Sequence, residues 1–275
     1  VIYEDEDLHT AATLDPQFDV NLKTLEIAFN RTCQLACSYC NPAFSSTWVK
    51  DIRTNGGYQG IKSDARGHFI DDAPYAEPFD QGEENPYVTA FWKWWPELSK
   101  ELEEIRVTGG EPLMVTGQQA VVGIYNELKR QDNLPGSMTF ETNGTQKLRE
   151  PFLEWAKSID TEIFFSCSPK LFTVSGEKRE KAIKPEIVAE YRKLSDKGQL
   201  KFVVGPDDRE WDEMEEVIKL FKAQGVDWPI WVMPTGAREE EQIAGAGKVA
   251  EKAFKRGYNV AARVHVYLFG NAIGT

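Results

Sequence analysis

The sequence has few cysteines and histidines and no long apolar run. Its 275 residues include 4 Cys and 3 His, and such sparing use of cysteine is typical of a reducing compartment. No apolar stretch approaches the roughly 18–20 residues that a membrane-spanning helix needs, and no signal peptide opens the chain. We therefore expect a cytoplasmic protein with no membrane partner. Because the sequence starts at Val1 and not at Met, it leaves open whether a leading segment precedes it.

Basic residues are also in short supply. The chain has 32 Lys and Arg against 44 Asp and Glu, a formal net charge of -12 and an isoelectric point near 4.9. A nucleic-acid-binding surface is normally basic, so we expect no nucleic-acid partner. Apolar residues, in contrast, make up 41% of the chain and include 8 Trp and 15 Phe, enough for a sizeable core. We interpret residues 1–275 as a single α/β domain.

Three of the four cysteines, Cys33, Cys37 and Cys40, lie close together at the spacing C-x3-C-x2-C. An odd set of thiols on so short a loop makes poor disulfide partners. Thiolates are the usual ligands of iron–sulfur clusters, and three of them leave one iron of a cubane cluster open to a substrate or cofactor. The alternatives are three incidental buried thiols or a structural zinc loop, although His68 is at no customary spacing for a fourth zinc ligand.

Strand-like and helix-like patterns alternate along the chain. The expected strands are residues 24–29, 105–108, 137–141, 162–166, 200–204, 229–233 and 263–269. The expected helices are residues 87–102, 118–130, 150–158, 185–197, 208–224 and 239–256. Strands separated by helices imply right-handed crossovers and a parallel sheet. We interpret residues 1–22 as a strap or poorly ordered arm, and residues 55–86, rich in Gly, Asp and Pro, as an insertion.

Two segments with chemical character follow the first two expected strands. The cysteine loop comes after residues 24–29, and Gly109-Gly110-Glu111 comes after residues 105–108. Active sites gather at the carboxyl ends of parallel strands, so both segments are expected at one site. Glycines let the backbone approach a ligand closely, and strand-end carbonyls with a carboxylate can hold an ammonium group. Taken alone, the glycine segment also fits an ordinary turn.

The cysteine spacing, Tyr39 before the third cysteine and the VTGGEP segment at 107–112 resemble the radical S-adenosylmethionine (radical SAM) superfamily. The resemblance implies a partial (βα)6 barrel and a 4Fe-4S cluster on the three cysteines. It also implies reductive cleavage of S-adenosylmethionine to a 5′-deoxyadenosyl radical, with the cofactor against Gly109, Gly110 and Glu111. Tyr39 would lie against the adenine, although an aromatic residue here could equally serve packing.

Later segments resemble 7-carboxy-7-deazaguanine synthases over roughly residues 104–275. The matching segments are Glu141-Thr142-Asn143-Gly144-Thr145, Ser166-Cys167-Ser168-Pro169-Lys170-Leu171, Lys201-Phe202-Val203-Val204 and residues 263–271. Such a lyase converts 6-carboxy-5,6,7,8-tetrahydropterin into 7-carboxy-7-deazaguanine with loss of ammonia and uses Mg²⁺. The resemblance implies a pterin-like substrate and an electron donor such as flavodoxin or ferredoxin. A homodimer is considered as its oligomeric state.

This resemblance also implies roles for single residues. The residues implied for the carboxylate and ribose of S-adenosylmethionine are Thr142, Asn143, Ser168 and Lys170. The residues implied for the substrate are Glu141, Arg263 and His265, with Lys170 as a further candidate for the substrate carboxylate. Each has a structural alternative: Asn-Gly is a common turn pair, Ser-Pro-Lys fits loop geometry, and a lone histidine in an apolar strand is often a core residue. Cys167 is interpreted as a small buried hydrophobe.

The first half departs from the synthase pattern. The third cysteine is followed by Asn41-Pro42, whereas the synthases have Asp-Thr there with the threonine on Mg²⁺. We therefore expect weak or absent Mg²⁺ dependence, with Ser45, Ser46 or Thr47 as substitute oxygen donors. The region also resembles radical SAM maturases that modify peptides or proteins, yet no cysteines remain for their accessory cluster. A peptide-modifying enzyme and a degenerate, non-catalytic binding protein stay open as alternatives.

Overall fold

The computed structural model describes residues 6–15, 17, 22–28, 32–61, 68–70, 84, 86–236 and 238–269. Within these residues the strands form one sheet in the order β1-β2-β3-β4-β5-β6-β7, and every neighbouring pair is parallel. The strands are β1 (Thr24–Ile27), β2 (Glu104–Val107), β3 (Ser137–Thr142), β4 (Glu162–Cys167), β5 (Gly198–Val204), β6 (Ile230–Pro234) and β7 (Asn259–Val260). β1 and β7 are the two edges, so the sheet is an open, partial barrel, as predicted.

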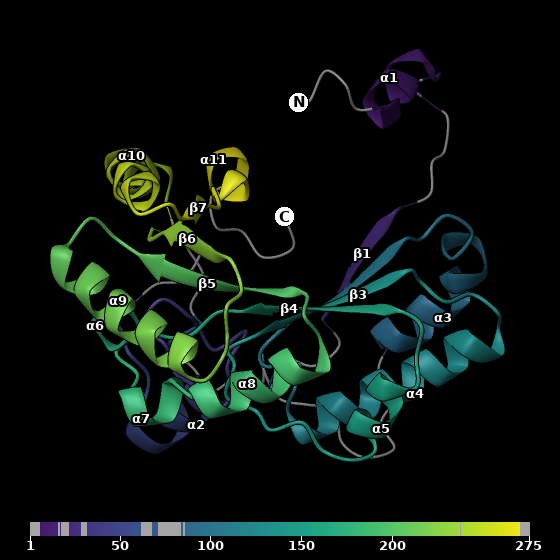
Figure 1. Cartoon of the computed structure of the whole chain (residues 1–275), viewed down its shortest axis with the longest axis horizontal. Helices are drawn as coiled ribbons and strands as arrows, with labels where there is room; N and C mark the ends of the chain where they lie inside the picture. Colours follow the sequence, from purple (N-terminus) through teal and green to yellow (C-terminus); the bar gives the residue numbers. More distant parts are fainter. Residues whose placement is uncertain are drawn as a thin grey trace.

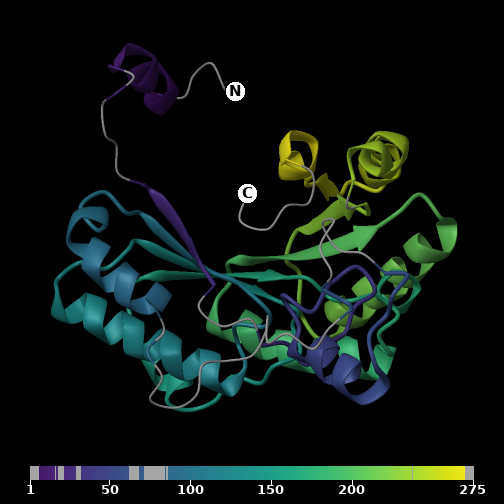
Figure 2. The same ribbon diagram turned by 180° about the vertical axis from the view of Figure 1, so that it is seen from behind.

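Helices flank this sheet. They are α1 (Glu6–Thr13), α2 (Ser46–Asn55), α3 (Pro86–Leu98), α4 (Val115–Arg130), α5 (Phe152–Lys157), α6 (Phe172–Ser175), α7 (Arg179–Ala182), α8 (Pro185–Leu194), α9 (Asp208–Ala223), α10 (Glu239–Lys255) and α11 (Val264–Phe269). α3, α4, α5 and α8 lie on the same side of the sheet, α10 and α11 stand beside β6 and β7, and α1 stands apart (Figures 1 and 2). None of the described helices combines the length and apolar character that crossing a bilayer requires.

Side chains alternate along the strands between an apolar face and a polar face. On the helix-covered face, Phe165 of β4 is fully buried and stacks on Phe140 and Tyr191, with ring centroids 5.7 and 4.9 Å away. On the opposite face the strands carry half-buried polar residues such as Arg106 and Lys201. A sheet with an apolar outer face under helices and a polar inner face is suited to line a cavity.

The prediction of a final strand at residues 263–269 is wrong. These residues contain helix α11, and the last strand is the two-residue β7, which pairs only with Trp231 and Val232 of β6. Within α11, Val266 is buried whereas Val264 and Leu268 are exposed. A short apolar run without glycine or proline reads equally as a buried strand or a short helix, which is why the sequence pattern misled us.

The N-terminal half contains helices that the sequence analysis did not predict. The arm at residues 1–22 includes α1, and α2 follows the cysteine loop. Ser45 caps α2, because its hydroxyl accepts a hydrogen bond from the backbone N–H of Trp48 at 3.3 Å. In the predicted insertion at 55–86, residues 62–67, 71–83 and 85 lie outside the described part of the chain. The other predicted elements are present with ends shifted by a few residues, as is usual for helix and strand boundaries.

Candidate functional site

A cavity of about 480 Å³ lies at the polar face of the sheet, near the carboxyl ends of the strands. The sequence-predicted residues that line it are Cys33, Cys37, Tyr39, Cys40, Gly109, Gly110, Glu141, Thr142, Asn143, Ser168, Lys170 and Arg263. Twelve positions spread over 231 residues of sequence therefore meet at one site. Glu111 is not part of the lining, and the side chain of His265 lies outside the described part of the structure.

The start of α2 holds the cysteine loop from one side. The hydroxyl of Ser45 donates to the carbonyl of Leu35 at 2.5 Å, and that of Thr47 donates to the carbonyl of Cys33 at 2.8 Å. The indole N–H of Trp48 donates to the carbonyl of Cys37 at 3.1 Å. Ser46 completes the set, donating to Cys33 at 3.2 Å. The hydroxyls that we considered as substitute Mg²⁺ donors thus fix the loop backbone in this structure.

The segment after β4 holds the same loop from the other side. The backbone N–H of Ser38 donates to the carbonyl of Ser175 at 2.8 Å, and the Ser38 hydroxyl donates to the carbonyl of Val174 at 2.7 Å. The carboxylate of Glu177, 7% exposed, accepts from the backbone N–H of Ala36. Sequence reasoning missed this contact, because Ala36 and Glu177 are 141 positions apart.

The three loop thiols suit a cluster with one iron per thiolate. All are free and line the cavity, and burial raises the pKa of Cys33 to about 12, that of Cys40 to about 11, and also that of Cys37. Burial thus disfavours the charged thiolates in this loop, and a bound cation such as iron would offset that effect. Within the described residues, no three His, Cys, Asp or Glu side chains gather closely enough to hold one single metal ion. Three cysteine thiols that line one cavity are the donor type that an iron–sulfur cluster takes.

Glu111 joins the ends of β2 and β3. Its buried carboxylate accepts from the Thr142 hydroxyl at 2.7 Å, from the Asn143 backbone N–H at 2.7 Å and from the Leu113 backbone N–H at 3.0 Å. Its backbone N–H also donates to the carbonyl of Thr32, just before the cysteine loop, at 2.7 Å. These contacts favour a positioning role for this side chain. Direct contact between its carboxylate and the cofactor, as the resemblance implies, remains a prediction.

Asn143 lines the cavity and carries a buried donor that has no acceptor among the described residues. It is 6% exposed, and its Oδ1 accepts from the Thr145 backbone N–H at 3.1 Å and from the Thr145 hydroxyl at 2.6 Å. No group in the described part of the chain accepts from its Nδ2. A buried donor without a partner costs about 1–3 kcal/mol, which an acceptor on a ligand would recover. The site therefore fits a ligand with an anionic oxygen, such as the carboxylate of S-adenosylmethionine.

Tyr39, Lys170 and Arg263 form a second side of the cavity. The Lys170 ammonium lies 5.7 Å from the centre of the Tyr39 ring and donates to the Ser168 hydroxyl at 3.0 Å. Tyr39 remains 45% exposed, so a face of its ring is available to a ligand. The guanidinium of Arg263 donates to the carbonyl of Gly236 at 2.7 Å.

Charged residues on the inner face of the sheet extend the site. Glu141 of β3 accepts from Arg106 of β2 and, at 3.1 Å, from Lys201 of β5. Burial alone would raise the pKa of Glu141, but the charges of Lys201 and Arg106 hold it below its usual range. Sequence reasoning missed Arg106 and did not assign Lys201 a role. A charged residue within an otherwise largely apolar strand, as in β2 and β5, is the signal that could have found both.

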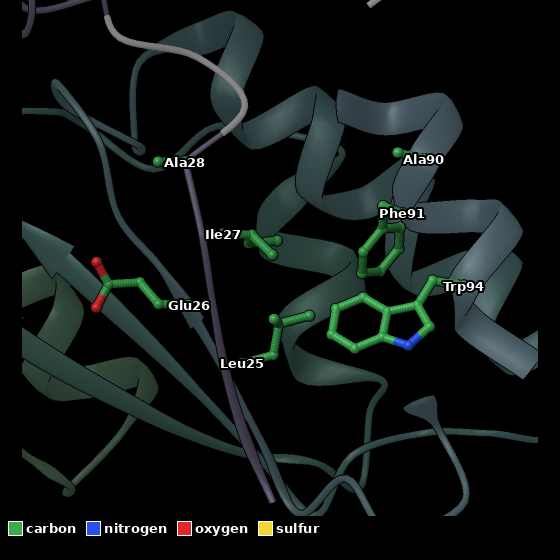
Figure 3. A pocket seen from close by; sticks show the side chains of 7 residues that line it. All are labelled: Leu25, Glu26, Ile27, Ala28, Ala90, Phe91 and Trp94. Carbon is green, nitrogen blue, oxygen red and sulfur yellow. The ribbon is translucent and has the colours of Figure 1, made fainter. Parts of the chain in front are cut away.

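Glu26 completes this charged face from β1. Its side chain points to the opposite side of the strand from Leu25 and Ile27, which face Phe91 and Trp94 of α3 (Figure 3). A second cavity of about 420 Å³, mostly apolar, is lined by residues of β1 and α3. Glu26 and Ala28 line both this cavity and the main one. Burial and the neighbouring Glu141 raise the pKa of Glu26.

Comparison with known proteins supports the resemblance at the level of sequence segments. No protein-family model matches the chain. The 7-carboxy-7-deazaguanine synthase of Rhodopirellula baltica is 27% identical over 184 residues, which are 63% of this chain and 64% of that protein. The synthase of Pyrobaculum aerophilum is 30% identical over 169 residues, 61% of this chain and 66% of that protein. The chain thus spans just under two thirds of the length of these curated relatives, and its predicted segmental likeness to them is confirmed.

Solved structures confirm the fold. SuiB of Streptococcus suis bound to precursor peptide SuiA superposes with a TM-score of 0.51 at 12% identity, over 94% of this chain and 59% of that chain. A second SuiB structure gives a TM-score of 0.50 at 12% identity, over 98% of this chain and 63% of that chain. At this low identity, the likeness concerns the arrangement of strands and helices only.

Proposed function

We propose that this chain is a radical SAM enzyme that holds a 4Fe-4S cluster through Cys33, Cys37 and Cys40. The observation that carries the proposal is that the three thiols line one cavity with Gly109, Gly110 and the unsatisfied amide of Asn143. When bound, the cluster supplies one electron for cleavage of S-adenosylmethionine into methionine and a 5′-deoxyadenosyl group. A flavodoxin or ferredoxin would serve as the electron donor.

The chain itself binds and orients the cofactor. In this proposal, Asn143 and Lys170 would hold its carboxylate, Ser168 and Thr142 its ribose, and Tyr39 its adenine; all five residues line the cavity. Gly109 has a φ of +108°, a conformation that glycine adopts readily, and it lets the backbone after β2 approach the amino group of the cofactor. The polar residues on the inner face of the sheet would then be available to bind the substrate.

The proposed substrate is 6-carboxy-5,6,7,8-tetrahydropterin, which a lyase of this type converts into 7-carboxy-7-deazaguanine. The proposal is supported by the two synthases that share 27% and 30% identity with this chain. It is also supported by the mixed charges of the cavity, since a pterin of this kind carries both a carboxylate and a planar donor–acceptor edge. Arg263 and Glu141, which the sequence resemblance implies for the substrate, both line the cavity.

Anaerobic reconstitution tests the cluster. The wild-type chain should bind about four iron and four sulfide per chain, and the reduced protein should release 5′-deoxyadenosine and methionine. Cys37→Ala should lose the cluster and the cleavage together. Cys167→Ala is the matched control, because Cys167 is buried in β4 and does not line the cavity. A protein that binds only zinc, or a Cys37→Ala variant with full iron content, would contradict the proposal.

Anaerobic turnover with 6-carboxytetrahydropterin tests the substrate. The deazapurine is followed by absorbance and mass, with and without Mg²⁺, and we expect little dependence on Mg²⁺ because Pro42 follows Asn41 where the synthases have threonine. Gly110→Val should impair cleavage, since a branched side chain would fill the space of the cofactor. If S-adenosylmethionine is cleaved but the pterin is neither consumed nor accelerates cleavage, the synthase assignment is wrong.

A peptide or protein substrate is the second candidate. It is supported by the Asn41-Pro42 departure beside the third cysteine. SuiB, which shares this fold, was solved with a precursor peptide. Cleavage of S-adenosylmethionine that responds to peptides and ignores the pterin would favour this candidate.

A further inference from the structure

The cavity concentrates positive charge in an acidic chain. The whole chain carries a formal net charge of -12, yet the cavity is lined by three cationic side chains, Lys170, Lys201 and Arg263, against two carboxylates, Glu26 and Glu141. Arg106 stands behind Glu141 and adds a further cation. Apart from the three thiols proposed to hold the cluster, the cavity thus has more cations than the one carboxylate of S-adenosylmethionine requires, which leaves a cation for a second anionic group.

The three cationic side chains that line the cavity differ in the hydrogen bonds that they already make. Lys170 lies at the cysteine end of the cavity, bonded to Ser168, and Arg263 is bonded to the carbonyl of Gly236. Lys201, whose side chain is 15% exposed, projects from the inner face of β5 and donates only to Glu141 among the described residues. An ammonium group has three N–H donors, so Lys201 has two left for a ligand.

Glu141 holds the Lys201 side chain in place but does not fully neutralise the positive charge of Lys201. Its carboxylate takes Arg106 on one oxygen and Lys201 on the other, so two cations share one anion. Arg106, Glu141 and Lys201 come from β2, β3 and β5, which are held in register by the sheet. The position of the ammonium is therefore set by rigid elements, as specific recognition requires.

We infer that Lys201 is the anchor for a carboxylate on the substrate, with Glu141 and Arg106 as its positioning residues. The inference rests on the proposed function, since it places the substrate on the strand side of the cavity, opposite the cysteine loop. Glu141, already shared by two cations, is then less suited than Glu26 to accept from the amino edge of the substrate. The substrate class is a small planar heterocycle that carries a carboxylate and a donor edge.

Equilibrium binding of two matched probes tests the anchor. The probes are 6-carboxypterin and pterin, which differ only by the carboxylate, and the protein is the reconstituted enzyme with S-adenosylmethionine. The wild type should bind the carboxylated probe roughly tenfold or more tightly, as one charge-assisted hydrogen bond allows. Lys201→Gln should bring the two dissociation constants together, whereas Lys201→Arg should keep most of the preference.

Lys197→Gln is the matched control, because the Lys197 side chain is 56% exposed just before β5 and outside the cavity lining. It should keep the wild-type preference. Lys201→Gln leaves Arg106 to neutralise Glu141, so the variant is expected to fold, and its iron content checks this. An unchanged preference in Lys201→Gln, or no preference in the wild type, would overturn the inference.

Cleavage of S-adenosylmethionine without any pterin, measured on the same samples, separates the two proposals. If the wild type cleaves the cofactor but shows no preference between the probes, the anchor is wrong and the proposed chemistry stands. If the wild type cleaves nothing, the proposed function is wrong, while the binding comparison still decides the role of Lys201.

Discussion

At the scale of single residues, the site contains a buried polar atom that lacks a hydrogen-bond partner in the described part of the chain. Asn143 illustrates this: one end of its amide is fixed by Thr145, and the other end has no acceptor among the described residues. Folding has left this donor unsatisfied, at a cost of about 1–3 kcal/mol. A ligand that supplies the missing acceptor recovers that cost. The unsatisfied donor therefore adds to the affinity of the protein for such a ligand.

Asn143→Asp tests this directly. The change keeps the size of the side chain and its acceptor for Thr145, but it replaces the free N–H donors by a negative charge. We expect the KM for S-adenosylmethionine to rise roughly tenfold or more, with the iron content unchanged. Kinetics of cofactor cleavage and iron analysis measure the two quantities. Asn133→Asp, in the turn after α4, is the matched control, and an equal effect there would show that the change acts on stability alone.

Glu141 predicts a pH dependence of stability. Lys201 and Arg106 lower its pKa in the folded protein relative to the unfolded chain. The ionised carboxylate therefore stabilises the fold at pH values above its ordinary pKa of about 4.3, and this contribution is lost as the pH falls through the lowered pKa. We expect Glu141→Gln to be less stable than the wild type at pH 7, with the difference shrinking below about pH 4. Denaturant unfolding at several pH values measures it, and a difference that does not shrink in acid would contradict the assignment.

At the scale of elements, the cysteine loop is held between the start of α2 and the segment that joins α6 to α7. The first support is local, since Ser45 and Thr47 lie within 14 positions of the carbonyls that they bind. The second is remote and depends on Glu177. Neither support uses a thiol, so the loop backbone can be ordered while its sulfur atoms remain available to iron.

Glu177→Ala should weaken the loop. It leaves the backbone N–H of Ala36 without its charged acceptor, a loss of about 1.5–3 kcal/mol for a hydrogen bond to a charged group. We expect lower iron content after reconstitution and a broadened electron paramagnetic resonance spectrum of the reduced protein. Glu177→Gln should restore a sharp spectrum, because an amide oxygen can also accept from Ala36. Glu180→Ala, at an exposed position nearby, serves as control, and a loss of iron there as large as in Glu177→Ala would argue against a specific tether.

The sequence predicted the type of an element correctly where its residue pattern fitted a strand but not a helix, or a helix but not a strand. β3 and β5 are bounded by turns and separated by helical stretches, so their type was clear, and the residues at their ends were found with them. α11 was mistaken for a strand because its six residues are too few to show a helical period. The segment Ser175-Gly176-Glu177 was noted for its resemblance to the synthases, but the contact of Glu177 with Ala36 was not predicted, and Arg106 was not singled out. Both contacts join segments that are far apart in the sequence, so no local pattern contains them. The sequence thus predicted the segments that carry the site but not the side chains that brace it.

At the scale of the whole molecule, one sheet separates two environments. Its helix-covered face is a continuous aromatic core in which Phe165 stacks on Phe140, Tyr191 and Trp228. Its other face carries the charges of the site. Successive residues of a strand point to opposite faces of the sheet. A substitution on the helix-covered face should therefore act mainly on the stability of the fold, and one on the other face mainly on ligand binding.

Two neighbouring residues of β4 test this separation. Phe165→Ala should reduce the free energy of unfolding by about 3–5 kcal/mol, because the removed ring leaves a cavity in the core. Phe164→Ala, one residue earlier and half-buried on the inner face, should cost clearly less. Denaturant unfolding of both variants gives the comparison. Equal losses would mean that the two faces of the sheet are not distinct in the way described.

The remote tether of the cysteine loop has a consequence for the order of events during synthesis. Cys40 leaves the ribosome 137 residues before Glu177, an interval on the order of ten seconds at usual rates of translation. Until then the backbone of Ala36 has no carboxylate to bind, and the loop has only its local support from α2. The three thiols of the nascent chain are thus exposed before the folded surroundings of the loop, Glu177 included, have formed. If the loop holds the proposed cluster, we expect the cluster to assemble after the fourth strand and Glu177 have been synthesised, and the thiols to be open to oxidation by air until then.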